Sequence, residues 1–245
     1  HTRYGTVTGV QTCALPILTG GSRGLGSATA KKLKELGNDL VLFAKDEARL
    51  RDSAVALGAS YEVVDLENIA HTRKVFKAAV DQYGVPEILM LAHGVMSDKM
   101  AKTLRTTDQE WQRVMTINLD SVFTIVNEVG AKMAEARNGR IIIYSACLGR
   151  MSGPGNAGGL APYRISKAGV NALVRNLAHE TGHGARGLWV DAICPNHSRT
   201  DMGGENAPRS AEEGAATAVW LATRELVSGT SLTGLLWEDN EVVPW

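Results

Sequence analysis

Residues 19–26 read TGGSRGLG and decide the fold that this sequence predicts. An apolar stretch ends at Leu18, and an amphipathic helix pattern follows over residues 25–36. Glycines at such a junction allow a tight turn and let backbone N–H groups approach a pyrophosphate at a helix N-terminus. The Gly-Lys-Ser/Thr ending of a Walker A loop is absent. A glycine turn can also be purely structural, but its position between a strand and a helix favours a dinucleotide site.

Short apolar runs alternate with helix-period segments along the rest of the chain. The predicted strands cover residues 39–44, 61–64, 87–92, 140–145, 188–194 and 235–237, and the predicted helices cover residues 25–36, 46–57, 67–83, 108–136, 163–183 and 210–223. Two helices open with a capping box, formed by Thr107 with Glu110 and by Ser210 with Glu213. Continuous apolar strands separated by helices indicate a parallel sheet that is covered on both faces. We therefore predict one α/β domain.

Residues 1–17 look foreign to that domain. They lack the features of a signal peptide, and residues 7–17 resemble the translation of a sequencing-library adapter. Pro16 supports this interpretation because proline removes a donor from a strand ladder. We expect a non-native extension over residues 1–17 and the folded domain over residues 18–245. The alternative is an ordinary first strand.

The composition argues against several classes of protein. Lys+Arg and Asp+Glu number 26 each, so the formal net charge is zero, and neither nucleic acid nor a membrane is an expected partner. No apolar run approaches the roughly 18 residues of a transmembrane helix. Three cysteines are too few for a disulfide framework, which favours a reducing, cytoplasmic location. Cys147 and Cys194 are expected to be buried strand-end residues and not a redox pair.

The end of the second predicted strand bears on cofactor choice. An NAD site places an acid there, to bind the ribose 2′-hydroxyl, but Ala44 occupies the position. Lys45 beside it and Arg23 in the glycine turn favour NADP(H), with NAD(H) possible. In the alternative interpretation Lys45 is solvated and Asp46 turns inward. Asp65, at the end of the third strand, is placed to accept the adenine amino group.

Residues 163–167 read YRISK and place Tyr163 and Lys167 on one helix face. A phenol with a pKa of about 10 is a poor acid–base group at neutral pH, and a neighbouring ammonium lowers that pKa. This pair, about 140 residues after the glycine turn, resembles the short-chain dehydrogenase/reductase family. The resemblance covers residues 18–245. Within the family, the chain most resembles the branch of NADPH-dependent carbonyl reductases. That likeness is strongest in residues 161–171, 199–204, 207–214, 219–223 and 243–245.

The resemblance implies a three-layer, doubly wound Rossmann fold with a mostly parallel seven-stranded sheet. It implies hydride transfer between a ketone or aldehyde and an alcohol, a small-molecule substrate, and a homodimer or homotetramer. Tyr163 would be the proton donor, Lys167 its activator and ribose ligand, and Asn118 the ligand of a proton-relay water. The implied cofactor contacts are Gly20, Ser22, Arg23, Gly24, Leu25, Gly26, Lys45, Asp65, Leu66, Ala92, Gly94, Tyr163, Lys167, Pro195 and Thr200.

Three departures from the family pattern stand out. Ala146 aligns with the serine that binds the substrate carbonyl. Ser145 completes the predicted catalytic set only if the strand end bulges, because a one-residue offset turns a side chain to the other face. His93 replaces an asparagine after the fourth strand, where it donates to substrate or has a structural role. Asn196 replaces a glycine, a mild change because asparagine tolerates positive φ. Residues 149–159 form a longer spacer than usual, which folds over the substrate or is a loose loop.

Two other functions compete with the reductase. The departures at residues 93 and 146 also suit a dinucleotide-binding protein with little catalysis. Residues 179–183 read HETGH and match the HExxH pattern of zinc hydrolases, for which Glu205 or His197 would have to supply a third ligand. Gly182 indicates that the helix ends inside the pattern, so paired imidazole geometry would be poor. We predict no metal site.

Overall fold

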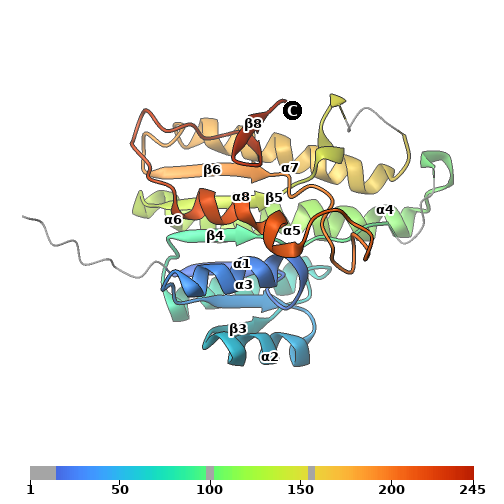
Figure 1. Ribbon diagram of the computed structural model, residues 1–245. Helices are drawn as coiled ribbons and strands as arrows, with labels where there is room; N and C mark the ends of the chain where they lie inside the picture. The colour runs from blue at the N-terminus through green and yellow to red at the C-terminus, as the bar shows by residue number, and fades with distance from the viewer. Residues whose placement is uncertain (1–14, 98–101, 154–157) are drawn as a thin grey trace, which may run out of the picture.

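The computed structural model describes residues 15–97, 102–153 and 158–245. Within these ranges one eight-stranded sheet runs in the order β3-β2-β1-β4-β5-β6-β7-β8 (Figure 1). Its strands are β1 (Pro16–Thr19), β2 (Val41–Ala44), β3 (Ser60–Val63), β4 (Ile88–Leu91), β5 (Gly139–Tyr144), β6 (Leu188–Ile193), β7 (Leu236–Glu238) and β8 (Glu241–Val243). All neighbouring pairs are parallel except β7 with β8. The predicted doubly wound α/β fold is confirmed.

The eighth strand corrects the expected count of seven. β8 returns antiparallel to β7 through a two-residue turn at Asp239 and Asn240, with φ of 53° and 65°. Short polar residues tolerate this left-handed backbone, which a tight hairpin requires.

The helices agree closely with the predicted segments. They are α1 (Gly24–Glu35), α2 (Glu47–Leu57), α3 (Ile69–Tyr83), α4 (Asp108–Met115), α5 (Ser121–Ile125), α6 (Ala131–Ala136), α7 (Ala161–Glu180) and α8 (Ala211–Thr223). The predicted helix over residues 108–136 is continuous, but two π-helical turns, Thr116–Asp120 and Val126–Gly130, join its three α-helical parts. Ser210 and Glu213 form the expected reciprocal capping box, and Thr107 accepts from the Glu110 backbone N–H. None of the helices in the described ranges has the length and apolar character needed to cross a membrane.

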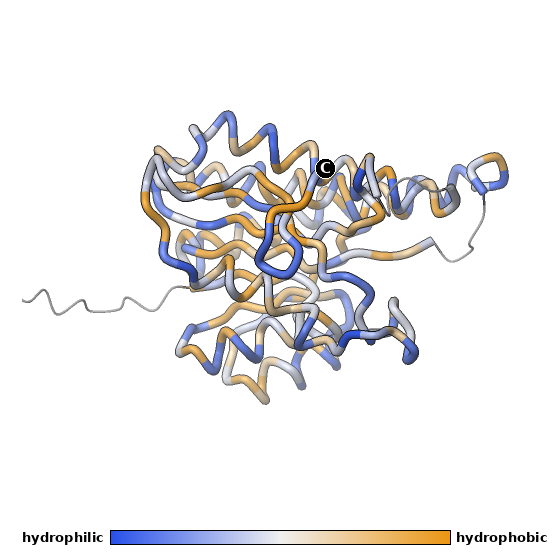
Figure 2. Tube along the Cα trace, turned by 45° about the horizontal axis from the view of Figure 1, so that its top comes forward, coloured by the Kyte–Doolittle hydropathy of each residue, from blue (hydrophilic) through white to orange (hydrophobic). Residues whose placement is uncertain are grey.

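Helices cover both faces of the sheet, which gives three layers (Figure 1). The core on one face joins the strands to α3, α5, α6 and α7, and includes the stacked rings of Phe43 and Phe76, whose centroids are 4.5 Å apart. The core on the other face joins them to α1, α2 and α8. In Figure 2 the strands inside the molecule are mainly hydrophobic, whereas the outer helices alternate in character. This is the pattern of a parallel sheet buried on both sides.

β1 begins two residues before the expected domain start at Leu18. Pro16 pairs with Ile88 of β4, and Ile17 and Leu18 are fully buried. A proline is tolerated as the first residue of a strand, where the missing donor costs least. The foreign origin of residues 1–17 stays a prediction, and residues 1–14 lie outside the described ranges.

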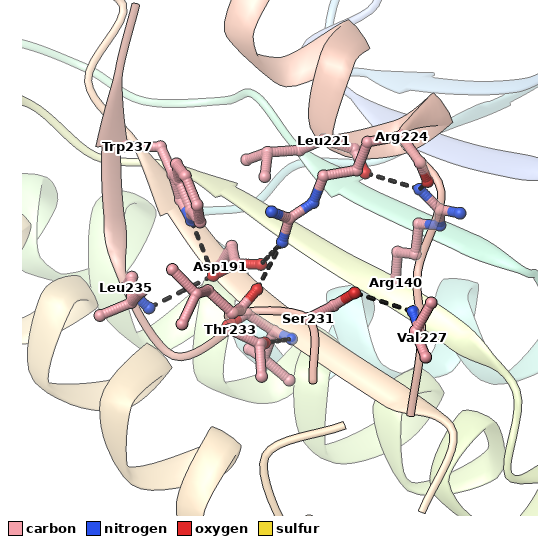
Figure 3. Close-up of polar contacts among 11 residues, drawn as sticks. Arg140, Asp191, Leu221, Arg224, Val227, Ser231, Thr233, Leu235 and Trp237 are labelled. Carbon is pink, nitrogen blue, oxygen red and sulfur yellow. Dashed lines mark hydrogen bonds and ion pairs between the residues drawn. The ribbon is translucent and has the colours of Figure 1, made fainter. Parts of the chain in front are cut away.

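A buried ion pair between Asp191 and Arg224 stabilises the C-terminal part of the sheet (Figure 3). The Asp191 carboxylate accepts from Trp237 Nε1 at 2.9 Å and from the Leu235 backbone N–H at 3.2 Å, and it lies 3.3 Å from the Arg224 guanidinium. That guanidinium is 4.9 Å from the ring centroid of Trp220 and 4.7 Å from that of Trp237. Burial raises the pKa of Asp191 to about 6, against the opposing effects of Trp237 and Arg224. The network holds β7 and the end of α8 against β6.

Candidate active site

A cavity of about 1010 Å³ lies at the carboxyl ends of the parallel strands. It is centred where the strand order reverses between β1 and β4, the usual ligand position in an open α/β sheet. Segments that follow six strands contribute to its wall, and the lining residues include 20, 22–26, 44–46, 64–67, 92–96, 144–148, 194–198 and 200–203. Tyr163 and Lys167 reach it from α7. The predicted cofactor and catalytic residues other than Asn118 therefore all line one cavity.

The glycine positions of the turn have little or no room for a side chain. A Cβ on Gly26 would lie 2.2 Å from the Gly20 carbonyl oxygen, and one on Gly20 would lie 3.0 Å from the Ala92 oxygen. Gly20 and Gly24 have φ of 72° and 55°. Arg23 is the N-cap residue of α1, but its side chain does not cap the helix. The first-turn amides of α1 are thus open to an anionic ligand, which fits a pyrophosphate.

The two predicted cations at the cavity rim are already paired with carboxylates. Arg23 lies 2.7 Å from Asp201. Lys45 lies 2.7 Å from Asp65 and 3.9 Å from Glu67. The hydrogen bond to Asp65 raises the pKa of Lys45. A 2′-phosphate that binds here must therefore exchange with these acids.

Sequence reasoning missed a third cation at this rim. Arg49, on α2, lines the cavity and lies 4.0 Å from Asp201. Asp201 follows Thr200 directly, so its position in the cavity was predictable. Its contact with the glycine turn depends on the path of the loop after β6, which the sequence does not define.

Tyr163 and Lys167 are both buried in the cavity wall. The Lys167 ammonium donates to the Tyr144 carbonyl at 2.7 Å and lies 6.0 Å from the centroid of the Tyr163 ring. Burial lowers the pKa of Lys167 to about 8. Burial also raises the pKa of Tyr163, and Cys194 and Cys147 raise it further. This differs from the expected lowering by the ammonium, because desolvation of the phenol dominates.

Asn118 lies in the π-helical turn next to Lys167. Its side chain accepts from the Val95 N–H at 2.8 Å and donates to the Val95 carbonyl at 2.9 Å and to Ser166 Oγ at 3.1 Å. A Cβ on Gly94 would lie 3.3 Å from Lys167 Nζ and 3.4 Å from Asn118 Oδ1. A side chain at residue 94 would therefore fill the space beside both polar atoms, and the glycine leaves that space unfilled.

The bulge that would aim Ser145 at the cavity is absent. The β5–β6 ladder continues regularly, and the Ser145 N–H donates to the Ile193 carbonyl at 2.8 Å. The Ser145 hydroxyl donates to Asn171 Oδ1 on α7. Ala146 instead belongs to the apolar cluster around Tyr163. At the position that the family pattern gives to a hydroxyl, this chain has a methyl group.

His93 has a structural role, which resolves the two interpretations of this residue. Its Nδ1 lies 2.6 Å from Thr19 Oγ1 and its Nε2 lies 2.9 Å from Ser121 Oγ. Because Ser121 donates its proton to the Ile117 carbonyl, it accepts from Nε2–H, and Nδ1 accepts from Thr19. Burial, followed by the charge of Lys167, lowers the pKa of His93 to about 3. The ring is neutral and has no proton left for a substrate.

Asn196 and Thr200, in the loop after β6, adopt conformations and contacts that suit their residue types. Asn196 adopts a left-handed backbone with φ of 56°, which asparagine tolerates. Thr200 packs against the glycine turn, since a Cβ on Gly24 would lie 3.2 Å from its methyl group. Part of the spacer over residues 149–159 falls on 154–157, outside the described residues.

The HExxH segment spans a helix end. α7 ends at Glu180, and His183 follows with φ of 48°. The rings of His179 and His183 pack edge to face with centroids 4.1 Å apart. Glu180 accepts from Asn176. Among residues 15–97, 102–153 and 158–245, no group of three or more His, Cys, Asp and Glu residues is placed to hold a metal ion.

Comparisons with known proteins agree with this geometry. A family model described as short chain dehydrogenase matches residues 15–211. The 3-oxoacyl-(acyl-carrier-protein) reductase of Rickettsia prowazekii is 32% identical over 186 residues, which cover 76% of this chain and 73% of that protein. A solved structure named ribose-5-phosphate isomerase, from Brucella melitensis, has a TM-score of 0.80 at 26% identity and covers 91% of this chain and 89% of its own. A structure of an actinorhodin polyketide ketoreductase has a TM-score of 0.80 at 23% identity and covers 94% and 96%.

Proposed function

Because this chain belongs to the short-chain dehydrogenase family, we propose that it is an NADPH-dependent reductase of ketones or aldehydes in which Tyr163 protonates the carbonyl oxygen. The observation that carries the proposal is the convergence of Tyr163 and Lys167 on a cavity that the glycine turn also lines, with Asn118 Oδ1 and Lys167 Nζ both facing Gly94. A bound nicotinamide supplies the hydride to the carbonyl carbon.

The residues of the cavity suit a dinucleotide. The backbone of the glycine turn and the N-terminus of α1 would hold the pyrophosphate, because the N-cap side chain makes no hydrogen bond to the first-turn amides and the glycines place no side chain over them. Lys167 would hold the nicotinamide ribose, and Thr200 the carboxamide. NADP(H) is favoured because Ala44 provides no acid for a 2′-hydroxyl, while Lys45 and Arg23 would pair with a 2′-phosphate by exchanging from Asp65 and Asp201.

The acid–base groups suit carbonyl reduction. A raised pKa keeps Tyr163 protonated at neutral pH, so it holds a proton to donate when negative charge develops on the carbonyl oxygen. Lys167, with a pKa of about 8, has the pKa of a group that exchanges protons near neutrality. The clear space beside Lys167 Nζ and Asn118 Oδ1 supports a water that returns the proton from solvent.

The substrate is proposed to be a small apolar carbonyl compound. Val95, Met96 and Leu148 pack against the Tyr163 cluster and line the cavity. The name of the Rickettsia relative points to 3-oxoacyl thioesters as the first compounds to test. A homodimer or homotetramer and a cytoplasmic location belong to the same proposal, and light scattering of the purified protein tests the assembly.

One observation favours a second candidate function. The missing hydroxyl at Ala146 removes a group that would bind the carbonyl, which suits a dinucleotide-binding protein with little catalysis. Such a protein would bind NADPH without reducing any substrate.

The test compares the wild-type protein with Tyr163→Phe. NADPH binding is followed by fluorescence, and turnover is measured on 3-oxoacyl thioesters, ketones and aldehydes. We expect both proteins to bind NADPH within about twofold, and the variant to lose about 100-fold or more in kcat, the usual contribution of a general acid. Binding without turnover by the wild-type protein supports the second candidate. Equal turnover of both proteins removes Tyr163 from the reaction.

A further inference from the structure

Two cysteines that are far apart in the sequence meet in the cavity wall. Cys194 follows β6 directly, and Cys147 lies just beyond the end of β5. These strands are parallel neighbours, so their carboxyl ends lie side by side (Figure 1). The Cys147 backbone N–H donates to Cys194 Sγ at 3.0 Å.

The two thiols influence each other and differ in accessibility. Their mutual interaction is the main cause of a lowered pKa at Cys147, about 7, and of a raised pKa at Cys194. Cys194 is buried as expected, but Cys147 is partly exposed, which corrects the expectation that both are buried. Cys147 is thus the thiol that a soluble oxidant can reach, and Cys194 is a protected thiol beside it. This is the arrangement of an attacking and a resolving cysteine.

The pair lies beside the reacting group of the proposed mechanism. Both cysteines line the same cavity as Tyr163, and both raise the pKa of its phenol. Pro195, an expected cofactor contact, follows Cys194 directly. A covalent change at the pair therefore acts on the catalytic cavity.

Contrary to the expectation from the sequence that they are not a redox pair, we propose that Cys147 and Cys194 are a modification site that hydrogen peroxide converts to an intramolecular disulfide. The Cys147 thiolate attacks one oxygen of hydrogen peroxide, which breaks the O–O bond, forms a sulfenic acid and releases hydroxide, which is protonated to water. The Cys194 sulfur then attacks the sulfenic sulfur, forms the S–S bond and releases a second water. The peroxide accepts the two electrons that the thiols lose. A thiol reductant reverses the change, as suits a protein of a reducing compartment.

The disulfide is expected to inhibit turnover. It joins the ends of β5 and β6, and it removes the thiolate from beside Tyr163. Displacement of reacting groups by about 1 Å can cost 100-fold in rate, so we expect oxidation to lower kcat at least tenfold. This consequence rests on the proposed function, whereas formation of the disulfide does not.

The test uses Cys13→Ser protein, because Cys13 is the remaining cysteine and lies outside the described residues. Protein is treated with hydrogen peroxide, and its free thiols and the masses of its peptides are measured without reductant. We expect two thiols to fall to none, a peptide pair joined through Cys147 and Cys194, and recovery of both thiols with dithiothreitol. In Cys13→Ser/Cys194→Ala protein, we expect Cys147 to stop at a sulfenic acid that dimedone traps. Cys13→Ser/Cys147→Ser protein is the matched control and should form neither product.

Each result decides a different part of the inference. Thiols that stay free in excess peroxide, or disulfides only between molecules, would overturn the site. A disulfide that leaves turnover unchanged would overturn its control of the reaction. If the reduced protein has no turnover on any carbonyl compound, the proposed function fails, while the thiol and mass measurements still decide the dithiol site.

Discussion

Replacing Ala146 with serine would place a hydroxyl in the apolar cluster that contains Tyr163. Ala146 is only 8% exposed, so the new group would lie in the cavity wall and not in solvent. The neighbouring Ser145 hydroxyl already donates to Asn171. This part of the wall therefore has only the Ala146 methyl group where a hydrogen-bond donor could bind the carbonyl oxygen of a substrate. The substitution adds one oxygen at that position.

The expected gain follows from the value of one hydrogen bond to a developing oxyanion. Preorganised donors of this kind contribute about 3 kcal/mol, and a donor added to an apolar wall will be less well oriented. We therefore expect about 1.5 to 3 kcal/mol, or roughly 10- to 100-fold in kcat/KM. Stability should fall by about 1 to 3 kcal/mol, because the hydroxyl is buried without a partner when no substrate is bound.

The assay compares kcat/KM of wild-type, Ala146→Ser and Ser145→Ala proteins on the best carbonyl substrate, with NADPH affinity measured in parallel. Ser145→Ala is the matched control. It should keep turnover within about twofold and lose about 1 to 3 kcal/mol of stability, because Asn171 Oδ1 loses its donor. An Ala146→Ser protein that folds and binds NADPH normally, yet gains nothing in kcat/KM, would refute the claim that a hydroxyl at residue 146 binds the carbonyl oxygen of the substrate.

Three further predictions concern the rim, the buried histidine and the buried ion pair. Ala44→Asp should lower the ratio of kcat/KM for NADPH to kcat/KM for NADH at least tenfold, since it adds an acid that binds the 2′-hydroxyl. An unchanged ratio would show that residue 44 does not contact the ribose of the cofactor. His93 has a native pKa of about 3 against 6.5 when unfolded. The neutral ring therefore stabilises the folded protein fully above pH 6.5, and this stabilisation is lost as the pH falls from 6.5 toward 3. Relative to His93→Asn, wild-type stability in urea should fall by about 2 kcal/mol from pH 7.5 to 5, and parallel curves would contradict a neutral buried ring. Asp191 has a native pKa of about 6 against 3.8 when unfolded, so its effect on stability has the opposite pH dependence and decreases as the pH rises. Relative to Asp191→Asn, the wild-type protein should lose about 2 kcal/mol from pH 4 to 7, and a gain would contradict it.

The sequence was sufficient for the parts of the fold that local chemistry determines. The glycine turn, the helix segments and the apolar strands have strong signals, because turn geometry and burial act on neighbouring residues. β8 was missed because it is a short edge strand with exposed residues, and such a strand has little apolar signal. β1 was doubted because of Pro16, and its position as the first strand residue explains why the proline is tolerated.

The site was harder to predict where long-range geometry decides. Tyr163 and Lys167 share a helix face, so their proximity follows from spacing. The direction of the Ser145 hydroxyl depends on whether the end of β5 bulges, and that depends on its pairing with β6. The contact between Cys147 and Cys194 depends on the same pairing, although 47 residues separate them in the chain.

The most direct test of the central claim uses NADPH that carries deuterium at C4 of the nicotinamide, prepared in both C4 epimers. We expect wild-type protein to transfer deuterium from one epimer to the carbonyl carbon of the substrate, as seen by mass spectrometry of the alcohol, and Tyr163→Phe to bind the cofactor but transfer almost none. An alcohol free of deuterium with both epimers, or equal transfer by the variant, would contradict the account.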